Sequence, residues 1–172
     1  MKKTQNTIAF AKYFVWIAWL MAFALLVFVF QDVLEHQWNP NAQPENTIGA
    51  DGKVEVRLLQ NKQGHYLTSG TINGAEVTFL LDTGATNVSI PMHIAEQLGL
   101  QRYGSGIAQT ANGSVRVYQT KLDELSIGAI YLYDVDASIN PGLRANEILL
   151  GMSALKQVAF SQSGKQLTLR QQ

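Results

Sequence analysis

The 172-residue chain contains no cysteine, and its charged residues are few for its length. Without cysteine it cannot hold a disulfide scaffold, a thiol nucleophile, or a zinc or iron–sulfur site built on thiolates. Histidine is scarce as well, because the three histidines, His36, His65 and His93, are scattered along the chain. We therefore expect no metal and no cofactor. The length allows one globular domain with modest additions and is too short for a two-lobed enzyme.

Basic side chains dominate only the first part of the sequence. Residues 1–31 carry Lys2, Lys3 and Lys12 and no acid, a charge of +3. The rest of the chain holds ten Lys and Arg against thirteen Asp and Glu, a charge of −3, so that the whole chain is neutral. A nucleic-acid-binding domain usually carries a basic patch, and none remains outside the first part. The composition argues against a nucleic-acid partner.

A long apolar run follows the basic residues. Eighteen residues, 13–30, contain no charge, glycine or proline. As a helix they would span ~27 Å, close to the thickness of the bilayer core. A cleaved signal peptide has a shorter apolar region that ends at a small-x-small site, whereas the nearby triplet of this kind, 22–24, lies inside the run. The sequence predicts an uncleaved transmembrane anchor over residues 13–30.

The charges on either side of the run predict its orientation. The lysines lie before it, and Asp32 and Glu35 lie after it. The positive-inside rule then places residues 1–12 in the cytoplasm and the rest of the chain across the membrane. In a Gram-negative bacterium this would be a single-pass protein of the inner membrane with a periplasmic domain. The polar stretch 31–52 contains proline and glycine and predicts a flexible tether, which leaves 53–172 as the folded domain.

The folded part is predicted to be mainly β. Turn signals separate short β-type runs, and Asn-Gly occurs at 73–74 and at 112–113, where it favours tight hairpins. One helix is expected over 91–99, with Pro91 in its first turn and Gly99 at its end. The strands are predicted at 54–59, 66–72, 75–81, 115–121, 130–139 and 167–170. This pattern indicates a small closed or barrel-like sheet.

The segment most indicative of chemistry runs from Val77 to Thr86. An apolar strand ends at Asp82, and Thr83, Gly84, Ala85 and Thr86 follow. Asp and Gly are turn formers, so this segment taken alone is compatible with an ordinary turn. A carboxylate directly after Phe-Leu-Leu is nevertheless an unusual end for a strand.

Asp-Thr-Gly-Ala after two leucines resembles the active-site loop of the retroviral-type aspartic proteases, the retropepsins. The late segment Ile148-Leu-Leu-Gly151-Met152 is similar to their apolar-Gly motif, and Thr110-Ala-Asn-Gly-Ser114 lies where they have a flap. The segments Gly64-His-Tyr66 and Gly70-Thr-Ile-Asn-Gly74 resemble the bacterial, membrane-anchored branch of the group. The resemblance covers about 53–170, and it implies a single-lobed, closed β-barrel.

The resemblance also implies roles for individual residues. Asp82 would be the catalytic carboxylate, Thr83 would hydrogen-bond across a dimer beneath the two carboxylates, and Gly84 would allow close backbone approach. Aspartic proteases need two carboxylates that share a proton. The chain has one Asp-Thr-Gly, so the second carboxylate must come from an identical chain in a homodimer.

Further expectations concern the surroundings of Asp82 and the dimer interface. Ala85 cannot donate a side-chain hydrogen bond to a carboxylate as serine would, which predicts a less acidic pH optimum than that of stomach-type enzymes. Ala111, Asn112, Gly113 and Ser114 are the candidate flap, which would bind an extended polypeptide and exclude water. Leu149, Leu150 and Gly151 are expected to pack behind the catalytic loop, and Leu167–Leu169 to pair with its twin at the dimer interface. Thr86 departs from the family, where retroviral enzymes often carry an acidic residue.

Two functions stay open. The first is a membrane-anchored aspartic endopeptidase acting on polypeptides close to the membrane, because attachment raises their effective concentration. The alternative is a non-catalytic peptide-binding scaffold or adaptor with the same fold. The intact Asp-Thr-Gly favours the enzyme, since binding alone would not require Asp82. An autoprocessed precursor whose tether is cut is a third possibility.

Overall fold

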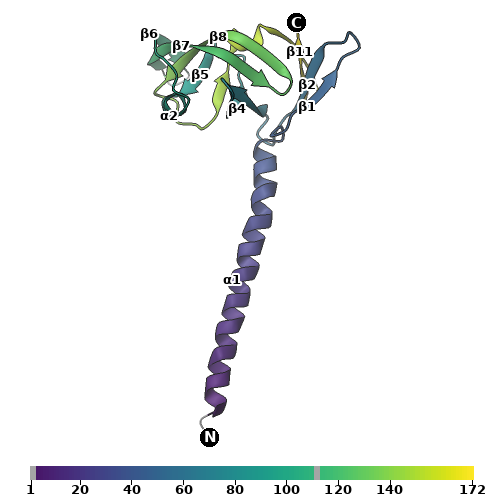
Figure 1. Ribbon diagram of the computed structural model, residues 1–172, viewed down its shortest axis with the longest axis vertical. Helices are drawn as coiled ribbons and strands as arrows, with labels where there is room; N and C mark the ends of the chain where they lie inside the picture. The colour runs from purple at the N-terminus through teal and green to yellow at the C-terminus, as the bar shows by residue number, and fades with distance from the viewer. Residues whose placement is uncertain (1–2, 111–112) are drawn as a thin grey trace. The chain divides into compact units, whose positions relative to one another are not determined.

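The computed structural model describes residues 3–110 and 113–172 (Figure 1). The chain divides into two units, Met1–Gln37 and Trp38–Gln172, and each is described by itself.

Helix α1 (Lys3–Trp38) forms the first unit and is 36 residues long. Its side chains from Tyr13 to Gln31 are all exposed, although nearly all of them are apolar. A helix that is apolar on every side needs an apolar environment around it. The part Tyr13–Trp38 has a mean hydropathy of 2.4 and is long and apolar enough to cross a membrane. A signal sequence near an N-terminus can also be long and apolar enough to meet this criterion.

The second unit is mainly β, as predicted, with two short helices where the sequence predicts one. In chain order its elements are β1 (Glu45–Ile48), β2 (Val54–Leu59), β3 (Leu67–Ile72), β4 (Ala75–Leu81), β5 (Val88–Pro91), α2 (Met92–Gln97), β6 (Gly104–Thr110), β7 (Gly113–Ile127), β8 (Ile130–Asn140), β9 (Ile148–Leu150), α3 (Met152–Leu155), β10 (Val158–Ser163) and β11 (Gln166–Gln171).

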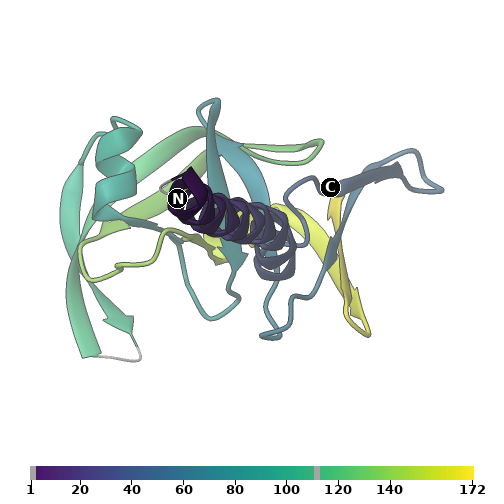
Figure 2. The same cartoon turned by 90° about the horizontal axis from the view of Figure 1, so that it is seen from below.

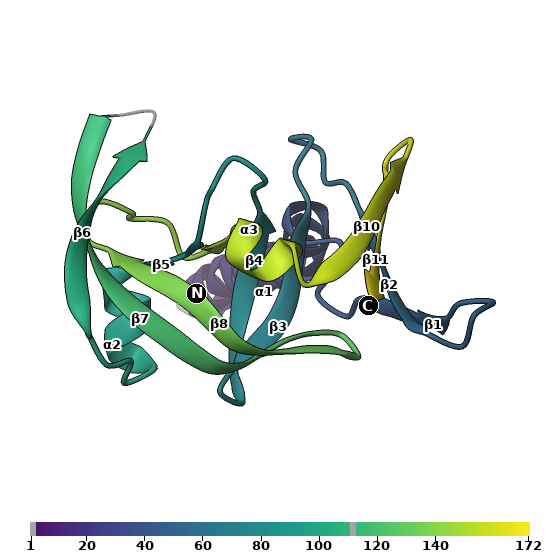
Figure 3. The same cartoon turned by 90° about the horizontal axis from the view of Figure 1, so that it is seen from above.

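The larger of the two sheets closes on itself. Its strand order is β3-β4-β9-β5-β8-β7-β6, and an additional pairing of β3 with β7 joins the two sides of the ring (Figure 3). At this seam Thr71 lies opposite Ser126 and Ile72 opposite Leu125. The ring encloses one apolar core, in which Phe79, Leu122 and Ile139 are fully buried. The predicted closed sheet is therefore present, with β6 attached outside the ring.

A smaller four-stranded sheet has the order β1-β2-β11-β10. Strand β11 lies in its interior, paired with β10 on one side and with β2 on the other. The expectation that Leu167–Leu169 pairs with a second copy is therefore wrong, because both edges of this strand are already occupied.

The stretch 31–52, expected to be a flexible tether, is largely ordered in the structure. Helix α1 continues to Trp38 because no glycine or proline interrupts 31–38, and Asn39-Pro40 follows its end. Strand β1 then pairs with β2 in antiparallel register. The folded unit consequently begins at Trp38 and not at 53.

Asn41 fastens the start of this unit to both sheets. Its side chain is 3 % exposed. The Nδ2 group donates to Leu59 O at 2.9 Å and to Leu67 O at 2.6 Å, and Oδ1 accepts from Leu59 N–H at 2.7 Å. Leu59 ends β2 and Leu67 begins β3, so a single amide side chain satisfies the backbone where the two sheets meet.

We expect Asn41→Ala to lower the free energy of unfolding by about 2–4 kcal/mol, because it removes three hydrogen bonds to backbone groups of Leu59 and Leu67, and the one to Leu67 O is buried. The measurement is chemical unfolding of the full chain in detergent, together with amide hydrogen exchange at Leu59. The neighbouring exposed residue Gln43 provides the control, and Gln43→Ala should change neither quantity. Unchanged exchange at Leu59 in Asn41→Ala would show that the side chain is dispensable.

Candidate active site

Asp82 directly follows β4, and the pairing of β4 with a second apolar strand fixes its position. Strand β4 runs parallel to β9, with Phe79 opposite Ile148 and Leu81 opposite Leu150. The Asp82 N–H continues this ladder by donating to Leu150 O at 3.2 Å. The sheet therefore fixes the backbone of Asp82, and the chain turns away directly after it.

The turn after β4 is organised around the carboxylate. The Gly84 N–H donates to Asp82 Oδ1 at 2.9 Å, and the Ala85 N–H donates to Asp82 O at 3.2 Å. Asp82 is half-buried, whereas Thr83 and Gly84 are exposed. One carboxylate oxygen is thus held by the backbone, while the loop presents its tip to the outside.

Helix α3 supports this loop from behind. The Met152 N–H donates to Ala85 O at 2.8 Å, and the Ser153 N–H donates to Thr86 O at 2.9 Å. The two free N–H groups at the start of α3 thereby find their partners in the loop after Asp82.

Ser153 is a supporting residue that the sequence reasoning did not identify. It is 5 % exposed. Its Oγ accepts from Val88 N–H at 2.9 Å and donates to Asp136 O at 2.7 Å, which joins the start of β5 to β8. No local sequence pattern marks this role, because its partners lie 65 and 17 residues away.

Gly151, which directly follows β9, has no room for a side chain against the loop after Asp82. A Cβ at this position would lie 2.7 Å from Ala85 O and 2.6 Å from the carbonyl carbon of Asn87. Leu150 before it is fully buried, and Leu149 is half-buried. The apolar-Gly segment therefore lies directly against the backbone of the loop that contains Asp82.

The candidate flap coincides with the hairpin of β6 and β7. The two strands are antiparallel, and their pairing runs from Gly104 opposite Gln119 to Thr110 opposite Gly113. Ala111 and Asn112 lie outside the described residues. Gly113 and Ser114 are exposed, and Ser114 Oγ donates to Gln109 Oε1 at 3.0 Å across the hairpin. Figure 2 shows this hairpin at one end of the sheet unit.

His65 and His93 both lie on the surface, and neither is among the hydrogen-bond partners given above for Asp82. His93 is hydrogen-bonded to Asn146 Oδ1 through Nε2 at 3.3 Å on the surface, and His65 lies in the exposed turn before β3. Among the residues that the structure describes, no group of three or more His, Cys, Asp or Glu side chains lies close enough to hold a metal ion.

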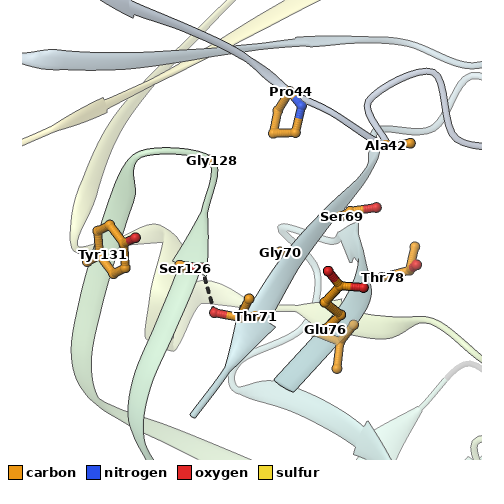
Figure 4. Close-up of a pocket in the computed structure, with 11 residues that line it drawn as sticks. Ala42, Pro44, Ser69, Gly70, Thr71, Glu76, Thr78, Ser126, Gly128 and Tyr131 are labelled. Atoms are coloured by element: carbon orange, nitrogen blue, oxygen red, sulfur yellow. Dashed lines mark hydrogen bonds between the residues drawn. The ribbon is translucent and has the colours of Figure 1, made fainter. Parts of the chain in front are cut away.

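A pocket of about 600 Å³ is lined by residues outside the loop after Asp82 (Figure 4). Residues from the first half of β4, from β3, from the β7–β8 turn and from the segment before β1 line it, and Thr71 Oγ1 and Ser126 Oγ are 2.7 Å apart in its wall. Glu76 is the carboxylate among its lining residues. The lining contains no residue of the loop 82–87, so the pocket does not form part of the candidate active site.

A closed β ring in which one strand ends in Asp-Thr-Gly, backed by an apolar-Gly segment and a short helix, defines the single-lobed retropepsin-like fold. The structure of a retropepsin-like aspartic protease from Rickettsia conorii is similar, with a TM-score of 0.56 and 24 % sequence identity, over 67 % of this chain and 98 % of that one. The EIAV protease complexed with the inhibitor HBY-793 gives a TM-score of 0.48 at 18 % identity, over 56 % of this chain and 89 % of that one.

The chain belongs to the family described as "gag-polyprotein putative aspartyl protease", whose model matches residues 68–157. This range includes the Asp82 loop, the β6–β7 hairpin and Gly151. An uncharacterized protein in the cobV 5′ region of Sinorhizobium sp is 32 % identical over 116 residues, which are 66 % of this chain and 50 % of that protein. The chain thus spans about half the length of this relative.

Proposed function

We propose that this protein is a membrane-anchored aspartic endopeptidase in which Asp82 from each of two identical chains forms the catalytic pair. The observation that carries the proposal is the placement of Asp82. It lies at the end of a core strand, with its carboxylate fixed by Gly84 N–H, in a chain with one Asp-Thr-Gly. A single carboxylate cannot supply both a base and an acid in the same step.

In the proposed pair one carboxylate is ionised and the other is protonated, because two like charges at close range do not both ionise. The ionised carboxylate takes a proton from water as that water attacks the scissile carbonyl carbon. The protonated carboxylate gives its proton to the carbonyl oxygen, so that a gem-diol forms. The C–N bond then breaks as the amide nitrogen takes the proton that the first carboxylate removed from water, and one gem-diol hydroxyl returns its proton to the second carboxylate. The exposed Thr83 and Gly84 leave the loop accessible to an identical loop, and Thr83 is the residue that we assign to the contact between the two.

The polypeptide substrate would lie extended beneath the β6–β7 hairpin, with Gly113 and Ser114 at the described part of its tip. A strand-like peptide in this position gains backbone hydrogen bonds without a requirement for one particular sequence. Ala111 and Asn112 belong to the same proposed flap.

We assign residues 13–30 to the membrane, residues 1–12 to the cytoplasm and the second unit to the extracytoplasmic side. Support comes from the exposed apolar surface of α1 and from the lysines that precede it. Anchoring would confine both copies and their substrates to the same surface, which favours pairing and membrane-proximal substrates.

The dimer requirement is tested by cleavage of a peptide library by the full chain in detergent over a thousandfold dilution. We expect the activity per chain to fall once the protein is diluted below its dimer dissociation constant, because only pairs are active. The mass in solution is measured on the same samples. Undiminished cleavage by a species with the mass of one chain would contradict the mechanism, and specific peptide binding without cleavage would favour the scaffold.

A further inference from the structure

The pocket of about 600 Å³ is built around one row of polar side chains that crosses four strands. Glu76 on β4 lies opposite Thr71 on β3, which in turn lies opposite Ser126 on β7. Ser126 lies opposite Tyr131 on β8. Opposite residues of antiparallel strands point to the same face of a sheet, so the four side chains form a continuous row. Figure 4 shows Glu76 and Tyr131 on opposite sides of the Thr71–Ser126 pair.

This row faces away from the core. Ile72 follows Thr71 and Leu125 precedes Ser126, and both of these apolar side chains are fully buried in the core. Successive side chains of a strand point to opposite faces, so Thr71 and Ser126 belong to the outer face. Neighbouring strands lie about 4.8 Å apart, which makes a row across four strands about 14 Å long. The sheet thus presents an extended line of polar groups to the outside.

The formal charge of the pocket wall is negative. Glu76 carries the single charge among the lining residues, and no Lys, Arg or His belongs to them. Its side chain is exposed, and it forms no ion pair within residues 3–110 and 113–172. An ionised carboxylate accepts hydrogen bonds and cannot donate them, so it attracts a cation and repels an anion. The wall therefore selects for a positively charged ligand.

Hydroxyl groups beside Glu76 supply further acceptors. Thr71 Oγ1 and Ser126 Oγ share one hydrogen bond at 2.7 Å, which leaves at least one lone pair on each oxygen. An ammonium group has three N–H donors and no acceptor, and a carboxylate together with hydroxyl oxygens can satisfy it. The ring of Tyr131 lies at the other end of the row, and the face of an aromatic ring also attracts cations.

The rest of the wall is partly apolar and is fixed by the fold. Ala42, Pro44 and Val77 contribute apolar groups, against which a methylene chain can pack. The segment that carries Ala42 is held in place, because the Ser69 N–H donates to Asn41 O at 3.1 Å. A pocket of this volume is within the size range of small-molecule sites, and a preformed wall lowers the entropic cost of binding.

We propose that this pocket binds a primary alkylammonium group, with Glu76 balancing its charge and the Thr71 hydroxyl accepting from a second N–H. A free di- or polyamine and the lysine side chain of a polypeptide both present this chemistry. The inference goes beyond the proposed function and does not depend on it, because no residue of the loop 82–87 lines the pocket.

Diaminohexane and hexanediol are suitable probes, because they share a chain length and differ in charge. Each is titrated into the isotope-labelled full chain in a non-ionic detergent, and the backbone amide NMR signals of Thr71 and Gly128 are followed, with Gly164 in the β10–β11 turn as the control. We expect diaminohexane to shift the two pocket signals in a saturable manner, and hexanediol to leave them in place. Equal shifts with hexanediol, or no saturable shift with diaminohexane, would overturn the proposal.

Two substitutions remove the same charge at different places on the sheet. Glu76→Gln keeps the size of the side chain, and Asp136→Asn neutralises an exposed carboxylate of β8 that does not line the pocket. We expect Glu76→Gln to raise the Kd for diaminohexane about tenfold or more, because a charge-assisted hydrogen bond is lost. Asp136→Asn should leave the Kd unchanged. An equal loss of affinity in both variants would mean that net charge governs binding, and it would overturn the pocket.

A blocked tripeptide with a central lysine distinguishes the two sources of the ammonium group, and its norleucine counterpart is the uncharged match. Binding of the lysine peptide in a manner sensitive to Glu76→Gln supports the site and identifies a polypeptide side chain as a sufficient ligand. Binding of diaminohexane without the lysine peptide supports the site and identifies a free amine. A norleucine peptide that binds as tightly as the lysine peptide would contradict recognition of the charge.

Discussion

Asp82→Asn is expected to reduce kcat/KM for peptide cleavage by about 10³-fold or more, because the amide can neither take a proton from water nor polarise the carbonyl as an acid. The substitution is isosteric, and the Asn side-chain oxygen can still accept from Gly84 N–H, which donates to Asp82 Oδ1 at 2.9 Å. The fold and the mass in solution should therefore stay unchanged. The measurement combines cleavage of a fluorogenic peptide library with the unfolding transition of each variant.

Asp123→Asn is the matched control, because Asp123 is an exposed carboxylate on β7 that ends no core strand. It should cleave as the wild type does. A loss of activity equal to that of Asp82→Asn would mean that general charge, and not the candidate dyad, governs the reaction.

Mixing the two forms tests whether both carboxylates of a pair are needed. When wild-type chains and Asp82→Asn chains are co-expressed in equal amounts, only about a quarter of the dimers contain two intact copies. We expect the activity per wild-type chain to fall to about half, as random pairing requires. Activity strictly proportional to the amount of wild-type chain would show that each copy acts alone.

The sequence predicts strand β4, which ends directly before Asp82, well because its signals are local. An apolar run ends at Asp82, and β4 has the predicted bounds, 75–81. The turn before it is the expected Asn-Gly hairpin, with Asn73 at φ 50° and Gly74 at φ 81°. Both conformations are those that such a turn requires and that glycine and asparagine tolerate. Local sequence signals are therefore enough to predict that Asp82 directly follows the end of β4.

What surrounds Asp82 is less predictable, because it depends on contacts between distant segments. The parallel pairing of β4 with β9 joins 79–81 to 148–150, and β9 is a strand of three residues. Helix α3 has four residues, too few for a helical period to be visible. The order of the motifs along the chain indicates that these segments belong together, whereas their hydrogen bonds emerge only from the fold.

The start of the folded unit escaped prediction for a different reason. Asparagine and proline in 39–44 have the composition of a linker, yet Asn41 is buried and hydrogen-bonded to both sheets. Composition shows that a segment is polar. It does not show whether the polar side chains are hydrogen-bonded to water or to backbone groups of the folded protein. Edge strands are equally hard to recognise, since β10 has neither apolar alternation nor a continuous apolar run.

Gly151→Ala is expected to impair the active site without changing any titratable group. The added methyl carbon would lie 2.7 Å from Ala85 O and 2.6 Å from the Asn87 carbonyl carbon, both of them backbone atoms that cannot rotate away. Backbone strain is not the cause, because Gly151 has φ −86° and ψ −175°, a conformation that any residue adopts. Either the loop after Asp82 or the β9–α3 junction must move.

We expect this overpacking to cost about 1–3 kcal/mol of unfolding free energy, and a displacement of the loop by ~1 Å to lower kcat about 10²-fold. The control is Gly106→Ala on β6, where a Cβ meets nothing within 4 Å and which should keep its stability. The unfolding free energy is measured for each variant, and kcat is measured at a temperature at which both variants are fully folded. A lower kcat then reports a less active folded protein and not a smaller folded fraction. A Gly151→Ala variant with unchanged kcat would show that the position of Asp82 does not depend on the close approach of β9. An unchanged kcat together with a lower unfolding free energy would restrict Gly151 to a structural role, because the loop would then have absorbed the methyl group without moving the carboxylate.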